Sequence, residues 1–359
     1  MRRVLAASGA LALMTGAATA GGVERSSQSV AILFEQGSYA ELSFGRVSPT
    51  VSGNLAPPAP AIGSGDMAPG YNTVALGYKT DLTDRMSMAV ILDQPIGADV
   101  AYPAGTGYPA AGSNATIDAT AVTGIVRYKM PSNFSVYGGI RAQTVSGSVA
   151  LQPSGYTMST STETDYGWLA GVAYERPEIA LRVALTYNSA IDHTFTVQEN
   201  GGPSLPFTTT VPQSWNLEFQ SGVAPDTLVF GSIRYVDWTA FDITPVGYLG
   251  VTGTSLVDYD NDTTTYSLGV GRRFNETWSG SLSFSHEAGT GPFSGNLGPT
   301  DGFTSAQVAA VYTRGPMKIT GGLRYIDIGE AQTRLSPTTT TNFSGNYGWA
   351  AGIRIGYSF

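Results

Sequence analysis

The residue types best suited to catalysis are the two histidines, His193 and His286, the only imidazoles among 359 residues. An imidazole that acts as a general base needs a nucleophile and an orienting acid in the same pocket. His193 shares its alternating phase with Tyr187, and His286 shares its phase with Phe284. Because side chains alternate across a strand, both rings should face outward near strand ends. We therefore predict no catalytic site, no enzyme activity and no cofactor.

A second possible chemistry is the binding of a carboxylate by arginine. Four arginines occupy the polar phase of their segments: Arg141, Arg234, Arg324 and Arg354. A guanidinium stays charged and holds a carboxylate through two parallel hydrogen bonds. The pattern leaves two interpretations open. Either the arginines bind the acidic head group of a ligand, or they pair with carboxylates of the chain, namely Glu24, Glu35, Glu41 and Glu218.

A third feature is the apolar character of two segments that should be surface loops. Residues 238–262 include Phe241, Tyr248 and Leu249, and residues 95–115 include Tyr102 and Tyr108. Exposed apolar surface with a polar rim is typical of capture sites for hydrophobic ligands. Packing of the loops against one another as a lid is the alternative, and the sequence does not separate the two.

The same loop carries three alternating aspartates, Asp258, Asp260 and Asp262. Carboxylates at this spacing suggest calcium, but the segment lacks the glycine and glutamate of a twelve-residue calcium loop. We predict solvated carboxylates and no metal site.

The elements that position these side chains are strands, as the last segment, residues 345–359, illustrates. Tyr347, Ile353, Ile355 and Phe359 alternate with small or charged residues such as Arg354. One face of this strand is apolar and the other is polar, with aromatic residues at both ends, as in a strand that crosses a bilayer. The terminal Phe359 resembles the signature that bacterial outer-membrane barrels present to their assembly machinery, so lipid bilayer and that machinery are expected partners.

The composition agrees with a barrel in a membrane. Only 13% of the residues are charged, the chain has 45 glycines and 19 tyrosines, and it has no cysteine. Residues 1–20 combine Arg2 and Arg3, an apolar run and Ala18-Thr19-Ala20, which predicts a secretory signal peptide cleaved after Ala20. The net charge is −8, with 27 acidic residues against 19 basic ones, so nucleic acid is not an expected partner.

Alternating segments predict about fourteen antiparallel strands and a single all-β transmembrane barrel over residues 39–359. The predicted strands are 40–48, 71–81, 85–94, 116–130, 134–150, 165–175, 179–194, 215–223, 227–237, 263–273, 277–287, 303–312, 317–327 and 345–359. Short connections alternate with long ones along the whole chain, which indicates short periplasmic turns and long extracellular loops. Arg46 shares phase with Leu42 and Phe44, and marks either a bulge or a position above the membrane.

Several segments resemble the FadL/TodX family of outer-membrane long-chain fatty-acid and hydrocarbon transporters. They are QSVAILFEQGSYAELSFGRVSPTVSG at 28–53, PQSWNLEF at 212–219 and YVDWTAFD at 235–242. Where the family carries an Asn-Pro-Ala-like phrase, this chain has Ser29-Val30-Ala31-Ile32, and the segment before the first strand is short. The resemblance implies an N-terminal hatch inside the barrel, here residues 21–38. Ser26 or Ser27 is a candidate cap for a short helix that ends before Gly37.

The resemblance also implies a lateral gap at an inward kink of the third strand. Pro95 cannot donate to a ladder and Gly97 tolerates unusual dihedral angles, so strand pairing should fail near them. Alternatively, Pro95 simply opens the long loop.

These observations predict a monomeric outer-membrane channel for passive uptake of hydrophobic molecules, gated by the hatch, with a luminal pocket beneath Leu33 and Phe34. A general porin for small hydrophilic solutes and a structural or adhesin-like surface barrel remain alternatives. The sequence does not specify the ligand.

Overall fold

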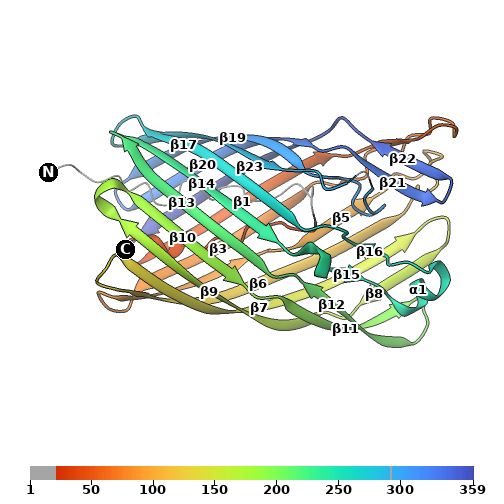
Figure 1. Cartoon of the computed structure of the whole chain (residues 1–359), viewed down its shortest axis with the longest axis horizontal. Helices are drawn as coiled ribbons and strands as arrows, with labels where there is room; N and C mark the ends of the chain where they lie inside the picture. Colours follow the sequence, from red (N-terminus) through yellow and green to blue (C-terminus); the bar gives the residue numbers. More distant parts are fainter. Residues whose placement is uncertain (1–21, 292) are drawn as a thin grey trace.

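The computed structural model describes residues 22–291 and 293–359, so the predicted signal peptide lies outside the described residues. These residues form a closed antiparallel barrel of fourteen strands (Figure 1). The strands of the wall are β1 (Tyr39–Thr50), β3 (Tyr71–Asp81), β4 (Met86–Asp93), β6 (Asn114–Lys129), β7 (Phe134–Leu151), β9 (Glu163–Arg176), β10 (Leu181–Asn188), β13 (Ser214–Ala224), β14 (Thr227–Val236), β17 (Thr263–Arg273), β18 (Trp278–Glu287), β19 (Phe303–Arg314), β20 (Met317–Ile328) and β23 (Asn346–Ser358).

The barrel closes where its first strand meets its last. β1 pairs with β23 from Tyr39 opposite Ser358 to Thr50 opposite Tyr347, without a shift of register. This pairing removes the free edges that the first and last strands would otherwise present to lipid.

The two ends of the barrel differ as the sequence predicts. At one end, the turn end, connections such as residues 225–226 and 315–316 are very short, and the C-terminus lies there (Figure 1). At the other end, the loop end, the connections are long and contain further elements. These are β2 (Gly53–Leu55), β5 (Gly97–Ala101), β8 (Tyr156–Thr160), β11 (Ile191–Glu199), β12 (Ser204–Val211), β15 (Asp242–Ile243), α1 (Val246–Thr252), β16 (Val257–Asp258), β21 (Ala331–Ser336) and β22 (Thr339–Phe343). Short 3₁₀ turns are η1 (Ala31–Phe34), η2 (Pro177–Ile179) and η3 (Trp238–Ala240).

The outer face of the wall is apolar and the inner face is mixed. On β20 and β23, Leu323 and Ile353 are exposed on the outside, whereas Arg324, Ala350 and Arg354 are buried inside. The predicted alternation is therefore confirmed for these strands. A continuous apolar exterior on a closed barrel is the form in which β-structure crosses a bilayer. Among the described residues, no helix is long and apolar enough to cross a membrane.

The prediction for His193 is wrong. The ring is fully buried, stacks on Phe195 and lies 3.0 Å from Asp165. The predicted strand 179–194 breaks after Asn188, and β11 begins at Ile191, so the two intervening residues reverse the phase. His286 is exposed on the outer face as predicted, within 3.0 Å of the Thr304 hydroxyl.

Arg46 lies in a regular ladder, opposite Ala351 and Asn72, so it is not at a bulge. Its side chain is exposed on the outside towards the loop end and donates a hydrogen bond to the Asn72 side-chain oxygen at 3.1 Å. The bulge interpretation is therefore wrong, and a position above the membrane stays a prediction.

Candidate functional site

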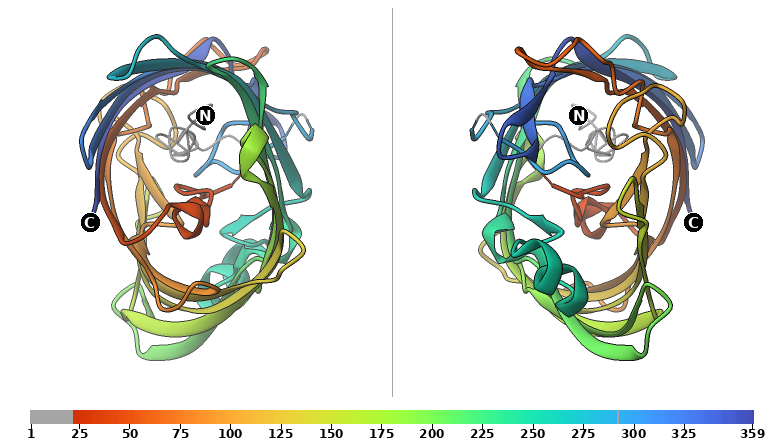
Figure 2. Two further views of the ribbon diagram at one scale, coloured as in Figure 1. Left: turned by 90° about the vertical axis from the view of Figure 1, so that its left-hand side faces the viewer. Right: turned by 90° about the vertical axis from the view of Figure 1, so that its right-hand side faces the viewer.

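The lumen is occupied by the N-terminal segment, residues 22–38, which lies inside the ring of strands (Figure 2). Polar contacts join it to the wall on several sides. Ser29 donates to a Glu218 carboxylate oxygen at 2.6 Å, and the Asn216 amide donates to the Ser27 carbonyl at 2.7 Å. Because partners on the wall satisfy these polar groups, the segment is docked in a defined position.

The helix predicted after Ser26 or Ser27 is only the single turn η1. Its residue Leu33 is fully buried, and Phe34 is nearly so. Two guanidinium groups lie over the Phe34 ring, with Arg127 at 4.4 Å and Arg182 at 4.6 Å from the ring centroid. Cation–π attraction to these groups favours this placement. In this conformation Leu33 and Phe34 pack against the wall, and neither lines the three cavities described below.

The four predicted arginines all point into the barrel. Arg234 is joined to Glu24 of the N-terminal segment, and Arg354 lies 3.7 Å from Glu41. In these two cases the carboxylate partner comes from the chain itself. Pairing with carboxylates of the chain, one of the two open interpretations, therefore applies to Arg234 and Arg354.

The other two arginines donate hydrogen bonds to neutral side chains. Arg141 donates to the side-chain oxygens of Gln28, at 2.9 Å, and Asn188, at 3.2 Å. Arg324 donates to Ser305 at 2.9 Å and stacks over Phe303. A cavity of about 90 Å³ lies between the segment and the wall of β14, β17, β18, β19 and β20. Both Arg234 and Arg324 line it, together with Phe230, Phe303 and several serines.

The third strand of the wall is interrupted close to this segment. β4 pairs with β6 as far as Asp93 opposite Ala121, and β5 resumes with Gly97 opposite Asp118. Between these two pairs, the strand formed by β4 and β5 (the kinked strand) has one residue more than β6, which is a β-bulge. Since β5 continues beyond it, Pro95 lies within an interrupted strand and does not merely open a loop.

On its other side the interrupted strand loses its neighbour. The ladder between β3 and β4 ends with Leu76 opposite Leu92, and no ladder pair joins β3 to β5 in the described part of the chain. One side chain spans the break, since the Gln94 amide oxygen accepts a hydrogen bond from the Val74 backbone at 3.2 Å. We call the region between residues 71–75 of β3 and residues 93–101 the wall break.

Backbone hydrogen bonds join the N-terminal segment to the wall break. Glu24 forms a bridge with Ile96, and the Gly97 N–H donates to the Val23 carbonyl at 2.8 Å. The Pro95 carbonyl accepts from the backbone of Arg25 at 2.9 Å. Proline lacks an N–H but retains its acceptor, which the segment uses here.

Arg25 is the residue of the segment that lies between the separated strands. Its guanidinium donates to Asp99 of β5 at 2.5 Å and lies 4.3 Å from the ring centroid of Tyr71 on β3. Gly97 does not have the unusual dihedral angles predicted for it. A Cβ at Gly97 would instead meet the Arg25 guanidinium at 2.5 Å, so the small residue provides room for Arg25.

The loop end contains two buried apolar clusters. Phe241 is buried with Trp238 and Phe195, and Tyr248 packs on Tyr156 with ring centroids 5.0 Å apart, whereas Leu249 is exposed. The second cluster includes the stacked rings of Tyr102 and Tyr108. The loops thus pack as a lid that still exposes apolar side chains, so features of both interpretations are present.

A cavity of about 350 Å³ opens between these loops and the start of the N-terminal segment. Val23, Val100, Tyr259 and Leu297 contribute apolar surface, and Asp99 is among the polar residues that line the cavity. The cavity therefore connects the loop end to the first residues of the segment and to β5. Asp262, one of the three alternating aspartates, accepts hydrogen bonds from Tyr235 and Thr239.

Several residues of this site were not anticipated. Arg127 alternates with the outward-facing Val126 and Tyr128, so its inward direction was available from the pattern. Arg25 lies in irregular backbone and has no periodic signal, whereas Gln94 ends the predicted strand 85–94 but lies beyond the end of β4 at Asp93.

Comparison with solved structures shows the same architecture in other proteins. A FadL homologue from Pseudomonas aeruginosa superposes with a TM-score of 0.74 at 14% identity over 92% of both chains. The fold is that of the FadL- and TodX-type channels. The P. putida toluene transporter TodX has a TM-score of 0.63 at 13% identity over 90% of both chains. The Ralstonia pickettii toluene transporter TbuX has a TM-score of 0.60 at 14% identity over 97% of both chains. No family model and no curated protein matches the chain. With its apolar outer wall, the closed barrel has the form of a transmembrane β-barrel.

Proposed function

We propose that the chain is a monomeric channel for passive uptake of hydrophobic small molecules, in which the N-terminal segment acts as a hatch. The observation that carries the proposal is the direct hydrogen bonding between this segment and the break in the wall. The fold shared with toluene transporters supports the same ligand class. The turn end then faces the periplasm, and Phe359 lies where the assembly machinery binds.

Capture takes place at the loop end in this proposal. Exposed Leu249 and partly buried Tyr248 lie over an apolar cluster, and the cavity of about 350 Å³ leads from the loops to the start of the hatch. Moving an apolar molecule from water onto such a surface is favourable by roughly 25 cal/mol per Å² of apolar area removed from water. Binding therefore needs no energy source, as expected for passive uptake.

Transfer past the hatch requires the hatch to shift. The luminal cavity beside Arg234 and Arg324 is about 90 Å³, which is below the size range of pockets that hold complete small-molecule ligands. Displacement of residues 22–30 would enlarge this cavity. It would also expose Arg234 to an acidic head group, because Glu24 moves with the hatch.

Release occurs sideways through the wall break in this proposal. When the hatch moves, Arg25 leaves the space between Tyr71 and Asp99, and the strands beside it have no ladder to keep them together. A hydrophobic molecule then enters the bilayer without crossing the aqueous periplasm.

Uptake of a radiolabelled fatty acid and of toluene into proteoliposomes tests the proposal. The expected result is saturable uptake that a variant lacking residues 22–30 alters. A general porin is the competing function. Large, steady conductance steps in planar bilayers by the intact chain, together with no saturable uptake, would replace the proposal by the porin.

A further inference from the structure

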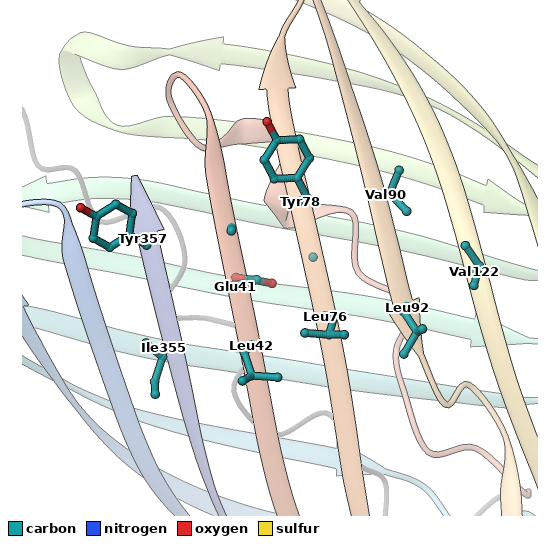
Figure 3. A pocket seen from close by; sticks show the side chains of 11 residues that line it. Glu41, Leu42, Leu76, Tyr78, Val90, Leu92, Val122, Ile355 and Tyr357 are labelled. Carbon is teal, nitrogen blue, oxygen red and sulfur yellow. The ribbon is translucent and has the colours of Figure 1, made fainter. Parts of the chain in front are cut away.

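The outer face of the barrel carries a groove of about 510 Å³ that crosses β23, β1, β3, β4 and β6 (Figure 3). Five aliphatic side chains form one row along it, and each lies directly opposite the next in the ladders between these strands. In order they are Ile355, Leu42, Leu76, Leu92 and Val122. Adjacent strands are about 4.8 Å apart, so the row from Leu92 to Ile355 extends roughly 14 Å.

The depth of the groove comes from one small residue. Ala40 lies in register between Tyr357 on one side and Tyr78 on the other. The two rings stand above the wall, at 45% and 44% exposure, and Ala40 leaves a depression between them. A long, narrow, apolar depression fits an extended alkyl chain better than a compact ring.

The position of the groove connects it to the wall break. Leu76 and Leu92 form the last ladder pair before β3 and the kinked strand separate, and both side chains belong to the groove. A molecule that leaves the barrel between these strands therefore meets the aliphatic row first. Behind the groove, Ile32 of the hatch packs against Gly77, whose absent side chain makes room for it.

We propose that this outer groove is a binding site for an unbranched alkyl chain released through the wall break. The inference rests on the proposed function and adds to it a binding site on the outer surface of the barrel. Inside a bilayer the surrounding lipid is as apolar as the groove, so selection depends on packing and on proximity to the break. Occupancy of the groove by the released molecule should therefore be modest, because bilayer lipid competes for the same surface. The main alternative is that the groove holds only bilayer lipid.

The test uses photolabelling of the full-length protein in proteoliposomes. The probe is hexadecanoic acid with a terminal diazirine, and the reference is a phospholipid that carries the same diazirine. Labelled peptides are quantified by mass spectrometry for the groove, at Leu76 and Leu92, and for the far outer wall, at the exposed Ile233 of β14. We expect the fatty-acid probe to favour the groove by about threefold over the far wall, given the small packing energies available in lipid.

Two matched variants report on the groove itself. Ala40→Phe fills the depression and should abolish the preference, whereas Ala310→Phe changes an exposed outer residue of β19 and should leave it unchanged. A binding curve for the lumen, measured from labelling of residues 22–38, should be the same in both variants. If the phospholipid labels the groove with the same preference, the groove holds ordinary bilayer lipid and the inference is refuted.

Failure of the inference differs from failure of the proposed function. Saturable labelling of residues 22–38 with uniform labelling of the outer wall would reject the groove and retain the channel. Absence of saturable labelling at the hatch would reject the channel, and the groove with it.

Discussion

Arg25 offers a direct test of whether the hatch keeps the wall break closed. Arg25→Met retains most of the side-chain volume and removes the charge, so it deletes the contacts to Asp99 and Tyr71 while preserving packing. Asp99 is about one-third exposed, so solvent screening limits the ion pair to roughly 1 kcal/mol. The desolvated cation–π contact adds about 1 kcal/mol.

The sum of about 2 kcal/mol corresponds to a roughly 30-fold larger population of the undocked hatch. Native-state hydrogen exchange measures this population through the amides that docking protects, which are those of Arg25 or its replacement, Ser26 and Gly97. In Arg25→Met their exchange should accelerate by about the same factor, whereas amides in the ladder between β19 and β20 should be unaffected.

Two further variants separate a specific effect from a general one. Arg176→Met removes a pair on an exposed turn, where both side chains are about half exposed, and should change no exchange rate measurably. Asp99→Asn alone leaves a buried guanidinium without its carboxylate, so the double variant Arg25→Met/Asp99→Asn should be no worse than Arg25→Met. The reasoning fails if the protected amides of Arg25→Met exchange within about twofold of the original rate, or if the whole barrel accelerates.

Three other predictions concern the hatch, the kink and the loops. Glu24→Gln leaves buried Arg234 without its charge partner and should weaken the docking free energy of the hatch by about 2–3 kcal/mol. The measurement is faster amide exchange of residues 22–30, and unchanged protection would contradict the prediction. Deletion of Pro95 removes the extra residue of the bulge and should restore a continuous ladder between the kinked strand and its neighbours. Fatty-acid uptake should then be abolished while luminal binding persists, and normal uptake would argue against lateral release. Burial and the neighbouring Asp260 and Asp242 raise the pKa of Asp258, so loop docking should be strongest in acid and weaken as the pH rises through this raised pKa, above 3.8. Asp258→Asn should remove the difference in loop protection factors, which are corrected for the intrinsic pH dependence of amide exchange, between pH 4 and pH 7; persistence of that difference would refute the assignment.

Much of the wall was predictable because a strand in lipid needs a strict two-residue alternation. Ile353 and Arg354 show the principle, since one faces lipid and the other the lumen, as their types require. His193 shows its limit. The alternation holds only within an unbroken strand. The strand breaks at Ser189 and Ala190, and because neither residue is a glycine or a proline, the sequence does not reveal the break.

The candidate site was less predictable because its contacts are made by irregular backbone. Pro95 indicated an interruption, but the sequence did not show that its carbonyl binds the hatch. Gly97 suggested unusual dihedral angles, whereas its real role depends on Arg25, which is 72 positions away in the chain. Such pairings between distant irregular segments follow from the completed fold and leave no periodic signature.

The pairing of β1 with β23 also has consequences for biogenesis. The first strand that is synthesised cannot find its final partner until the last strand is complete, so ring closure is the latest long-range event and one that contact order makes slow. During that interval both edges stay open to pairing with other chains, and only prompt delivery to the membrane limits this. Loss of residues 355–359 would remove the ladder pairs of Tyr39 to Leu42 with Ser358 to Ile355, and would leave that end of the closing seam unpaired.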